Sequence, residues 1–367
     1  MKLRCDRDVL AEALQTAQRG VSTRPGFPAL TGVLLSVGNE GLTLTTTDLE
    51  VTTEVQVPVE ASEEGVALVP ARLVADMVKS LPPDTVEIST DGAQARAVCR
   101  SFEGTLRLLP AEDFPALREP QGTRVTVGAA HFAEAVGQVA RAASRDEARP
   151  VLTGILVEAN REGLIMAATD SYRLAVRELS ATGEGEATAL VPERALSEAG
   201  RAAAGEEKGE VEIILGEAQA AFRAGSLRLT SRLIEEQFPN YRQLMPEPGE
   251  NKLAAGRQEL LEAVRRVGLL ARESSPVRLE LNALGVRLTS SSPDLGGAVE
   301  AVEAGYQGDD LTVAFNPHYL GDGLAGVTAD RVQVEFRDGL KPAVIRGEGS
   351  EAFTYLVMPV RLPAPVG

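Results

Sequence analysis

The sequence contains no tryptophan, two histidines and two cysteines, and aromatic residues make up 4% of its 367 residues. Cys5 and Cys99 have neither the spacing of a metal site nor that of a disulfide framework, so we expect two small buried side chains in a reducing compartment. A Ser-His-Asp triad would have to use His131 or His318, and neither lies in a catalytic or metal-binding pattern. The scarcity of aromatics also argues against platforms that stack single-stranded bases.

Long apolar runs are missing as well. No stretch approaches the roughly 18 apolar residues of a membrane helix, and the start MKLRCDRDVL lacks the apolar region of a secretory signal. We therefore expect a cytoplasmic protein with no membrane contact. From the scarcity and spacing of histidine and cysteine we also expect no metal, and we expect no cofactor.

Phosphate-binding motifs are equally scarce. The sequence has no GxxxxGK[ST] loop, and its one GxGxxG, at 321–326, lies in a helix-like segment that runs into the strand-like RVQVEF. A dinucleotide site needs a strand before this motif and a helix after it. An enzyme that uses the motif remains an alternative, which saturable binding of NAD would support.

The charge balance limits how the chain can meet nucleic acid. Its formal net charge is -16, whereas phosphate binding depends on Lys and Arg, so the charge argues against a surface covered with nucleic-acid contacts. The 37 basic residues can still form a local basic face.

The main feature that is present is an internal repeat. LTGVLLSVGNEGLTLTTTDLEV at 30–51 returns as LTGILVEANREGLIMAATDSYRLAV at 152–176, with matching residues 122 positions apart, and a weaker third copy keeps Gly285 and Val286. LVPAR returns as LVPER, and LAEAL returns as FAEAV and then LLEAV. This spacing predicts three domains, at 1–123, 124–249 and 250–367.

Each copy has the same order of patterns. A helical spacing at Leu10, Ala13 and Leu14 precedes alternating segments such as GLTLTTT and VTTEVQVPV, and a second helix and further strands follow. Helix, strands, helix, strands, repeated three times, predicts an α+β fold with helices on one face of antiparallel sheets.

Basic residues return on the expected helices. Arg72 and Lys79 lie seven positions apart on one helix face, and 122 residues later so do Arg194 and Arg201. On the first helices, Arg19 of copy one is matched by Arg141 of copy two, and Arg24 in copy one and Arg145 and Arg149 in copy two come just beyond. Two interpretations stay open, namely solvated charges paired locally and a face that contacts the backbone of duplex DNA without reading its sequence.

Four further motifs are distinctive, namely LPAEDFPAL at 109–117, ATDSYRLAV at 168–176, FPNYRQLMP at 238–246 and YLVMPVRL at 355–362. Together they resemble those of the bacterial sliding clamp, the beta subunit of the replicative DNA polymerase. The resemblance implies a DNA-clamp fold without catalytic activity. It also implies a head-to-tail homodimer, closed into a ring around duplex DNA, with helices lining the hole and sheets outside. The implied partners are the polymerase alpha subunit, the clamp-loader delta subunit and other proteins with a clamp-binding motif.

The resemblance also assigns residues. Arg24, Arg72, Arg149 and Arg194 match DNA contacts, and the recurring charges add Lys79, Arg141, Arg145 and Arg201. The implied dimer contact joins Leu106 to Leu269 and Leu270. The implied partner-peptide pocket, which falls in copies two and three, contains Leu152, Thr169, Ser171, Tyr172, Arg173, Leu174, Pro239, Leu244, Asn316, Tyr319, Pro342, Met358, Pro359, Val360, Arg361 and Leu362.

The polar run in AATDSYRLAV looks catalytic until it is compared with copy one. Thr169 and Asp170 recur as Thr47 and Asp48, so we expect them to shape a shared turn. Ser171, Tyr172 and Arg173 do not recur, and we interpret them as part of a docking wall. A peptide-binding hub with no role on DNA is the alternative. The chain departs from the family at three places: the family often has His at Tyr172 and Arg at Gln243, and some relatives have an aromatic at Gly104. It also continues with the tail 363–367 beyond the usual family end.

Overall fold

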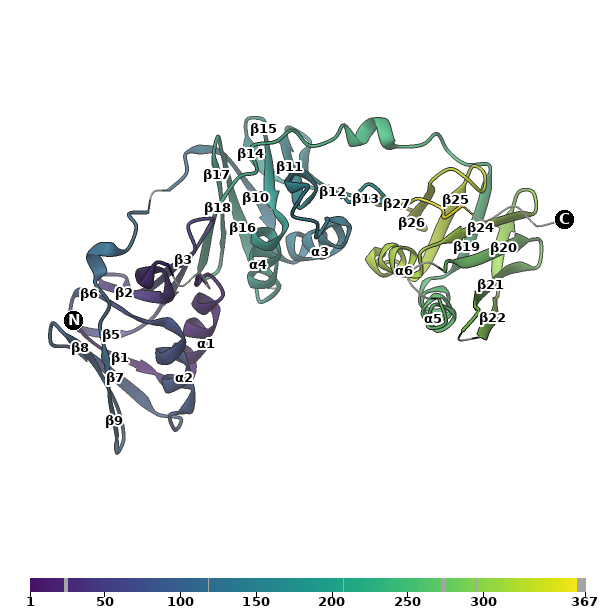
Figure 1. The fold of residues 1–367 in the computed structure, drawn as a ribbon. Helices are drawn as coiled ribbons and strands as arrows, with labels where there is room; N and C mark the ends of the chain where they lie inside the picture. Colours follow the sequence, from purple (N-terminus) through teal and green to yellow (C-terminus); the bar gives the residue numbers. More distant parts are fainter. Residues whose placement is uncertain (23–25, 118, 207, 272–274, 295, 362–367) are drawn as a thin grey trace. The chain divides into compact units, whose positions relative to one another are not determined.

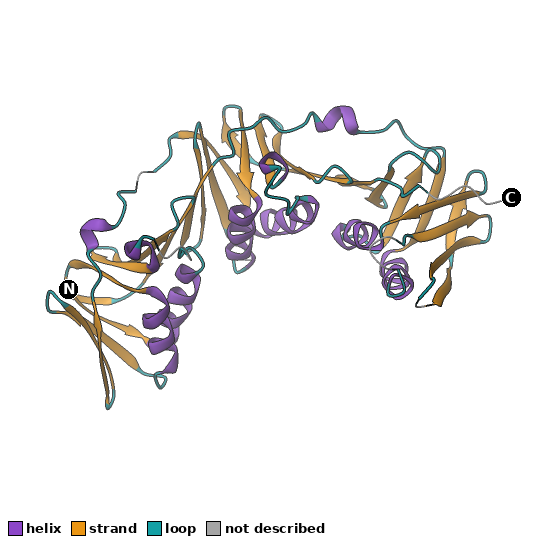
Figure 2. Ribbon diagram, viewed as in Figure 1, coloured by secondary structure: helices purple, strands orange, loops and turns teal. Residues whose placement is uncertain are grey.

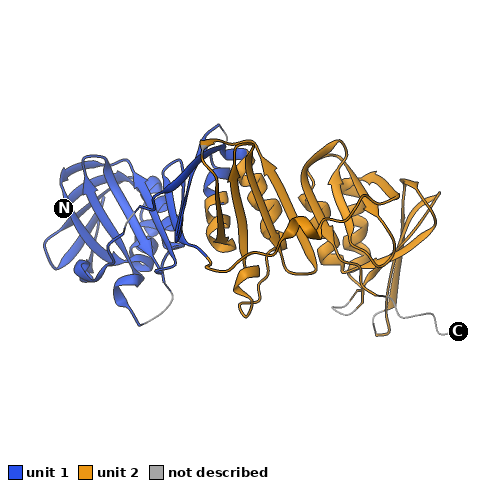
Figure 3. Cartoon of the chain, turned by 90° about the horizontal axis from the view of Figure 1, so that it is seen from above, with its two compact units in different colours: residues 1–130, 201–233 blue, residues 131–200, 234–367 orange. Residues whose placement is uncertain are grey.

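The computed structural model describes residues 1–22, 26–117, 119–206, 208–271, 275–294 and 296–361. The chain divides into two compact units, residues 1–130 with 201–233 and residues 131–200 with 234–367 (Figure 3). Within the described ranges, no helix is long and apolar enough to cross a membrane, and no three His, Cys, Asp or Glu side chains gather in a way that could hold a metal ion.

The described residues form six α-helices, two in each copy of the repeat (Figure 1). The first begins where the Asp6 carboxylate accepts hydrogen bonds from the backbone N–H groups of Asp8 (2.8 Å) and Val9 (3.3 Å). Its apolar spacing buries Leu10 and Leu14 against strands. The helices are α1 (Arg7–Gln18), α2 (Ala71–Ser80), α3 (Ala129–Val139), α4 (Glu193–Ala204), α5 (Arg257–Gly268) and α6 (Pro317–Gly326).

Unit 1 contains two antiparallel sheets, and α1 and α2 pack on each other and on one of them (Figure 2). The first has the order β5 (Glu60–Glu63), β1 (Lys2–Asp6), β7 (Thr85–Thr90), β8 (Gln94–Cys99), β9 (Phe102–Arg107). The second includes, in order, β10 (Gly122–Gly128), β16 (Glu210–Gly216), β17 (Gln219–Ala224), β18 (Leu227–Arg232), β4 (Val51–Val57), β3 (Gly41–Thr47), β2 (Gly32–Gly38), β6 (Gly65–Pro70).

Unit 2 repeats this plan with α5 and α6 packed together on its strands. One sheet has the order β15 (Ala187–Pro192), β11 (Gly154–Asn160), β12 (Gly163–Thr169), β13 (Arg173–Leu179), β27 (Ser350–Val357), β26 (Ala343–Gly347), β25 (Arg331–Phe336), β19 (Asn251–Gly256), β23 (Ala304–Gln307). The other has the order β22 (Gly296–Val302), β21 (Gly285–Ser292), β20 (Val277–Asn282), β24 (Leu311–Phe315). The short β14 (Thr182–Glu184) follows β13 along the chain.

The strand orders reveal how the copies are joined. Copy one contributes the series β6-β2-β3-β4, copy two β15-β11-β12-β13 and copy three β24-β20-β21-β22. A second series is β1-β7-β8-β9, then β10-β16-β17-β18, then β19-β25-β26-β27. Copy one joins copy two where β4 pairs with β18, and copy two joins copy three where β13 pairs with β27. The α+β prediction of three tandem domains with two helices each is therefore confirmed.

Candidate functional site

The turn at 169–173 is built as the repeat predicts. The Thr169 hydroxyl donates to the carbonyl of Arg173 (2.6 Å), and the Asp170 carboxylate accepts from the backbone N–H of Arg173 (3.1 Å). In copy one, Thr47 donates to the carbonyl of Val51 (3.1 Å), and Asp48 accepts from its N–H (2.8 Å). Threonine and aspartate thus serve the shared turn, as expected, and leave the next three side chains to vary.

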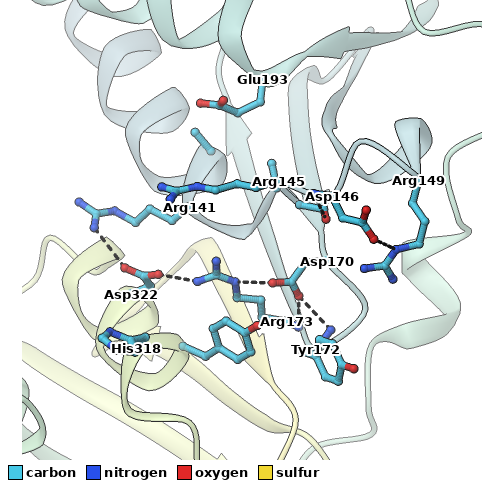
Figure 4. Close-up of a pocket in the computed structure, with 14 residues that line it drawn as sticks. Arg141, Arg145, Asp146, Arg149, Asp170, Tyr172, Arg173, Glu193, His318 and Asp322 are labelled. Carbon is cyan, nitrogen blue, oxygen red and sulfur yellow. Dashed lines mark hydrogen bonds and ion pairs between the residues drawn. The ribbon is translucent and has the colours of Figure 1, made fainter. Parts of the chain in front are cut away.

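Arg173 is the most constrained of those three side chains. Its Nε donates to Asp170 (2.9 Å) and its Nη1 to Asp322 on α6, so it ties copy two to copy three (Figure 4). The guanidinium lies 4.4 Å from the ring centroid of Tyr319, within range of a cation–π contact. Burial by itself lowers the pKa of Arg173, but Tyr355, Asp322 and Asp170 outweigh it, so the pKa is raised and the charge is permanent.

Tyr355 connects Arg173 to the backbone of Tyr319. Its hydroxyl donates to the carbonyl of Tyr319 (3.0 Å), and its ring is fully buried. Burial raises the pKa of Tyr355, so the phenol stays neutral and keeps its proton for this hydrogen bond. Tyr319 in turn stacks on Tyr172, with ring centroids 6.2 Å apart, which fixes one wall of the site.

Beside this wall lies an apolar groove of about 270 Å³, here called the second-copy groove. Exposed apolar side chains at its mouth include Tyr172, Leu244 and Met358, and its floor continues into a core cluster with Leu174 and Leu356. Its lining residues are Leu152, Thr169, Ser171, Tyr172, Arg173, Leu174, Pro239, Leu244, Pro342, Leu356 and Met358. Apolar walls with few polar groups suit an extended chain with apolar anchors.

Ten of the sixteen residues that the resemblance assigned to the pocket line this groove. Tyr319 does not line the groove but stacks on Tyr172, which does. The Asn316 side chain caps α6 by accepting from the N–H groups of His318 and Tyr319. Pro359, Val360 and Arg361 lie beyond it, where the Val360 N–H donates to Ala314 (2.7 Å), and Leu362 lies outside the described residues. The sequence reasoning missed Leu356, which pairs with Leu174 across the β13–β27 junction.

The basic residues fall on helices and the loops after them. Arg72 and Lys79 are exposed on α2, Arg194 and Arg201 are exposed on α4, and Arg24 lies outside the described residues. The Arg72 side chain is 88% exposed and has a 4.0 Å approach to Asp76, an ion pair of little energetic weight. This placement leaves its charge available to a ligand.

Arg141, Arg145 and Arg149 line a polar cavity of about 650 Å³ that adjoins the wall formed by Tyr172 and Arg173 (Figure 4). Arg141 lies 3.5 Å from Asp322, and Arg149 donates to Asp146 (3.0 Å). Arg145 has no ion-pair partner within the described part of the chain. The cavity therefore offers at least one unpaired guanidinium to an anion.

The residues assigned to the dimer contact differ in exposure. Leu269, just after α5, is 79% exposed, and Leu270 is partly buried, whereas Leu106 on β9 is 7% exposed within its own sheet. Phe102, two residues before Gly104 on the same strand, is exposed, and a Cβ on Gly104 would lie 2.8 Å from its ring. The aromatic ring of this strand therefore comes from position 102 and covers the glycine.

The GxGxxG segment has a packing role. It forms most of α6, and a Cβ on Gly323 would lie 2.5 Å from the Tyr355 ring, while one on Gly326 would lie 2.7 Å from the Phe353 ring. The glycines let the helix approach strand β27 closely. Cys5 and Cys99 are free and buried, as expected.

Three similar copies, joined edge to edge, with an apolar groove between the second and third, define a three-domain clamp protein. Family models of the DNA polymerase III beta subunit match in the same order: the N-terminal domain at residues 1–118, the central domain at 126–240 and the C-terminal domain at 242–361. The chain belongs to the DNA polymerase III beta subunit family.

Individual relatives agree over the full length. The chain is 40% identical to the beta sliding clamp of Streptomyces coelicolor, covering 99% of this chain and 100% of that protein. It is 36% identical to the beta sliding clamp homolog GriR of Streptomyces muensis, covering 98% and 99%. A crystal structure of the sliding clamp from Pseudomonas aeruginosa bound to griselimycin matches with a TM-score of 0.94 at 31% identity, covering 99% and 100%. Sliding clamps are non-catalytic accessory subunits, so the enzyme alternative is excluded.

Proposed function

We propose that the protein is a processivity clamp that closes head to tail with a second copy around duplex DNA and holds the replicative polymerase through the second-copy groove. The observation that carries the proposal is the strand order. β4 pairs with β18 and β13 pairs with β27, and the corresponding strands left at sheet edges are β22 and β9. An unpaired edge is a template for another chain. Two copies can satisfy both edges by pairing β22 of each with β9 of the other.

The two internal junctions also predict the register of this contact. Val176 pairs with Thr354 across β13–β27, and Glu54 pairs with Arg228 across β4–β18. The repeat identifies the corresponding residue on β22. Ala167, the partner of Val176 on the neighbouring strand, corresponds to Thr289, which lies 122 residues later. Thr289 pairs with Val299, so Val299 takes the place of Val176 in copy three.

The partner position on β9 follows in the same way. Arg228 pairs with Arg223, and 125 residues earlier Glu103 pairs with Val98. Val299 of one copy therefore lies opposite Glu103 of the other. Phe102, next to Glu103 on β9, and Leu269, just after α5, are exposed and supply apolar area for the contact. We assign supporting positions in the same contact to Leu106 and Leu270.

DNA contact rests on Arg72, Lys79, Arg194 and Arg201 on helices α2 and α4. It also rests on Arg141, in the 3-10 turn Ala140–Ala142 after α3, and on Arg145 and Arg149 just beyond that turn. We place Arg24 with them by position in the sequence. Contacts of this kind reach phosphates and carry no sequence information, which suits a protein that slides. We place the protein in the cytoplasm, with the polymerase alpha subunit, the clamp-loader delta subunit and other proteins carrying the same peptide motif as partners.

The test uses topology. Protein loaded onto nicked circular duplex DNA should remain bound at a salt concentration that abolishes direct binding, and it should be lost when the circle is cut once. Equal retention on the circular and the linear DNA would refute the ring. A peptide-binding hub without a DNA role predicts no retention on either, and the names of the relatives do not favour it.

A further inference from the structure

Unit 1 contains a second groove at the place that corresponds to the second-copy groove. This first-copy groove has a volume of about 360 Å³ and lies at the junction of β4 with β18. Thr47 and Leu49 line it, as Thr169 and Ser171 line the other, and Pro115 of the FP dipeptide in LPAEDFPAL takes the place of Pro239 in FPNYRQLMP. The fold therefore builds the same hollow twice.

The floors of the two grooves occupy the same positions but differ in polarity. Thr52 pairs with Thr230 in unit 1, where Leu174 pairs with Leu356 in unit 2. Gln219, the first residue of β17, occupies the position that corresponds to Pro342, which comes directly before β26. Two hydroxyls and a carboxamide thus replace three apolar side chains. Thr230 is buried, and Thr52 and Gln219 are partly buried. Such a polar floor favours a ligand that supplies hydrogen-bond partners and disfavours one that is wholly apolar.

The rim of the first-copy groove is apolar and open. Leu49 is 51% exposed and Leu117 is 40% exposed, and both line the groove. Leu49 also has a φ of 77°, a left-handed conformation that is strained for leucine. Copy two places Ser171 at the same position with a φ of 81°. An exposed, strained leucine contributes little to folding, so its apolar surface is available for binding.

The charged side chains at this groove already lie near partners of opposite sign, although the buried Nε of Arg228 has no hydrogen-bond partner among the residues that the structure describes. The guanidinium of Arg228 lies between two carboxylates, 3.5 Å from Glu54 and 3.5 Å from Glu119, and Arg223 donates to Glu119 at 2.6 Å. A charged ligand side chain would have to compete with these pairs. The Thr52 hydroxyl already donates to Thr47 (2.9 Å) but can still accept, so an uncharged amide can donate to Thr52 and bond to Thr230 and Gln219.

We propose that the first-copy groove binds an extended peptide in which an uncharged amide side chain lies between leucine-like side chains. The apolar side chains cover Leu49 and Leu117, and the amide reaches the floor at Thr52, Thr230 and Gln219. The second-copy groove, with its apolar floor, prefers a peptide that is apolar at the same position. The two grooves of one chain thereby select different peptides.

Two capped, fluorescein-labelled peptides test this selectivity on the full chain by fluorescence polarisation. One has the sequence Ala-Leu-Gln-Leu-Ala and the other Ala-Leu-Leu-Leu-Ala. Leu117→Ser should weaken binding of the glutamine peptide about tenfold, the effect of losing roughly 1.4 kcal/mol of contact. The matched change Leu244→Ser, at an exposed leucine of the second-copy groove, should leave the glutamine peptide unaffected and weaken the leucine peptide.

A second variant guards against misfolding. Leu49→Asn removes the apolar surface and introduces a residue that tolerates the left-handed turn better, so it should also weaken the glutamine peptide without lowering the midpoint of thermal unfolding. The proposal is overturned if the glutamine peptide shows no saturable binding, or if Leu244→Ser weakens it as much as Leu117→Ser does. Retention on circular DNA does not depend on this groove, so failure here would leave the proposed clamp function standing.

Discussion

Removing two exposed charges from α2 tests the basic face most directly. Arg72 and Lys79 share one side of the helix, and the ion pair of Arg72 with Asp76 is long, at 4.0 Å. The variant Arg72→Ala/Lys79→Ala should fold normally, because exposed pairs of this kind contribute at most about 1 kcal/mol. Each lost phosphate contact lowers the slope of log K against log salt by about 0.9, so the pair should lower it by about 1.8.

The size of the effect makes it measurable. Raising salt fourfold, from about 50 to about 200 mM, should weaken the parent protein about twelvefold more than the variant. Fluorescence anisotropy with a labelled linear duplex gives both slopes. The control is Arg124→Ala/Arg331→Ala, which changes the net charge equally but removes strand residues paired to Glu212 at 2.8 Å and to Glu348 at 2.7 Å. Equal slopes for the two double variants would refute a specific role for α2.

Three further predictions concern the dimer, the wall of the groove and pH. The variant Glu103→Cys/Val299→Cys should form an intermolecular disulfide under mild oxidation, seen on a non-reducing gel, whereas Arg107→Cys/Val299→Cys, about 13 Å out of register, should not. Arg173→Met should lower the free energy of unfolding, measured in urea, by about 3 kcal/mol, because it leaves the carboxylates of Asp170 and Asp322 without this cation. An unchanged urea midpoint would contradict this. Burial and Glu158 raise the pKa of Tyr241 to about 12, so stability should fall as pH rises from 10 to 12, and Tyr241→Phe should flatten that fall.

The repeat made the domain plan and the turn predictable from sequence. A constant spacing of 122 residues aligns Thr47 with Thr169 and Asp48 with Asp170, and the hydrogen bonds of the two turns are the same. Local patterns suffice here because every bond of the turn spans five residues or fewer. Exposure of the basic residues on α2 and α4 could be predicted for a similar reason, since it follows from helical periodicity.

Contacts between copies were beyond this reasoning. The partner of Arg173 is Asp322, 149 residues away, and nothing local identifies it. Leu356 joins the groove because β27 pairs with β13, a register that single-sequence patterns leave undetermined. A usable signal was overlooked at Asn316, because an asparagine followed by proline before an apolar helix is typical of a helix N-terminus.

The acidic net charge and the basic helices can be reconciled through topology. A chain with a formal charge of -16 is repelled by DNA at long range, so a few exposed arginines cannot supply tight binding at physiological salt. In the proposed ring they need not do so, because closure through the β9 and β22 edges keeps the protein on the duplex. Weak phosphate contacts then center the DNA without arresting it, since a stronger basic face would slow sliding. In the proposed ring, the pairing of the strand edges therefore determines how long the protein stays on the DNA, and the basic helices affect only how fast it slides.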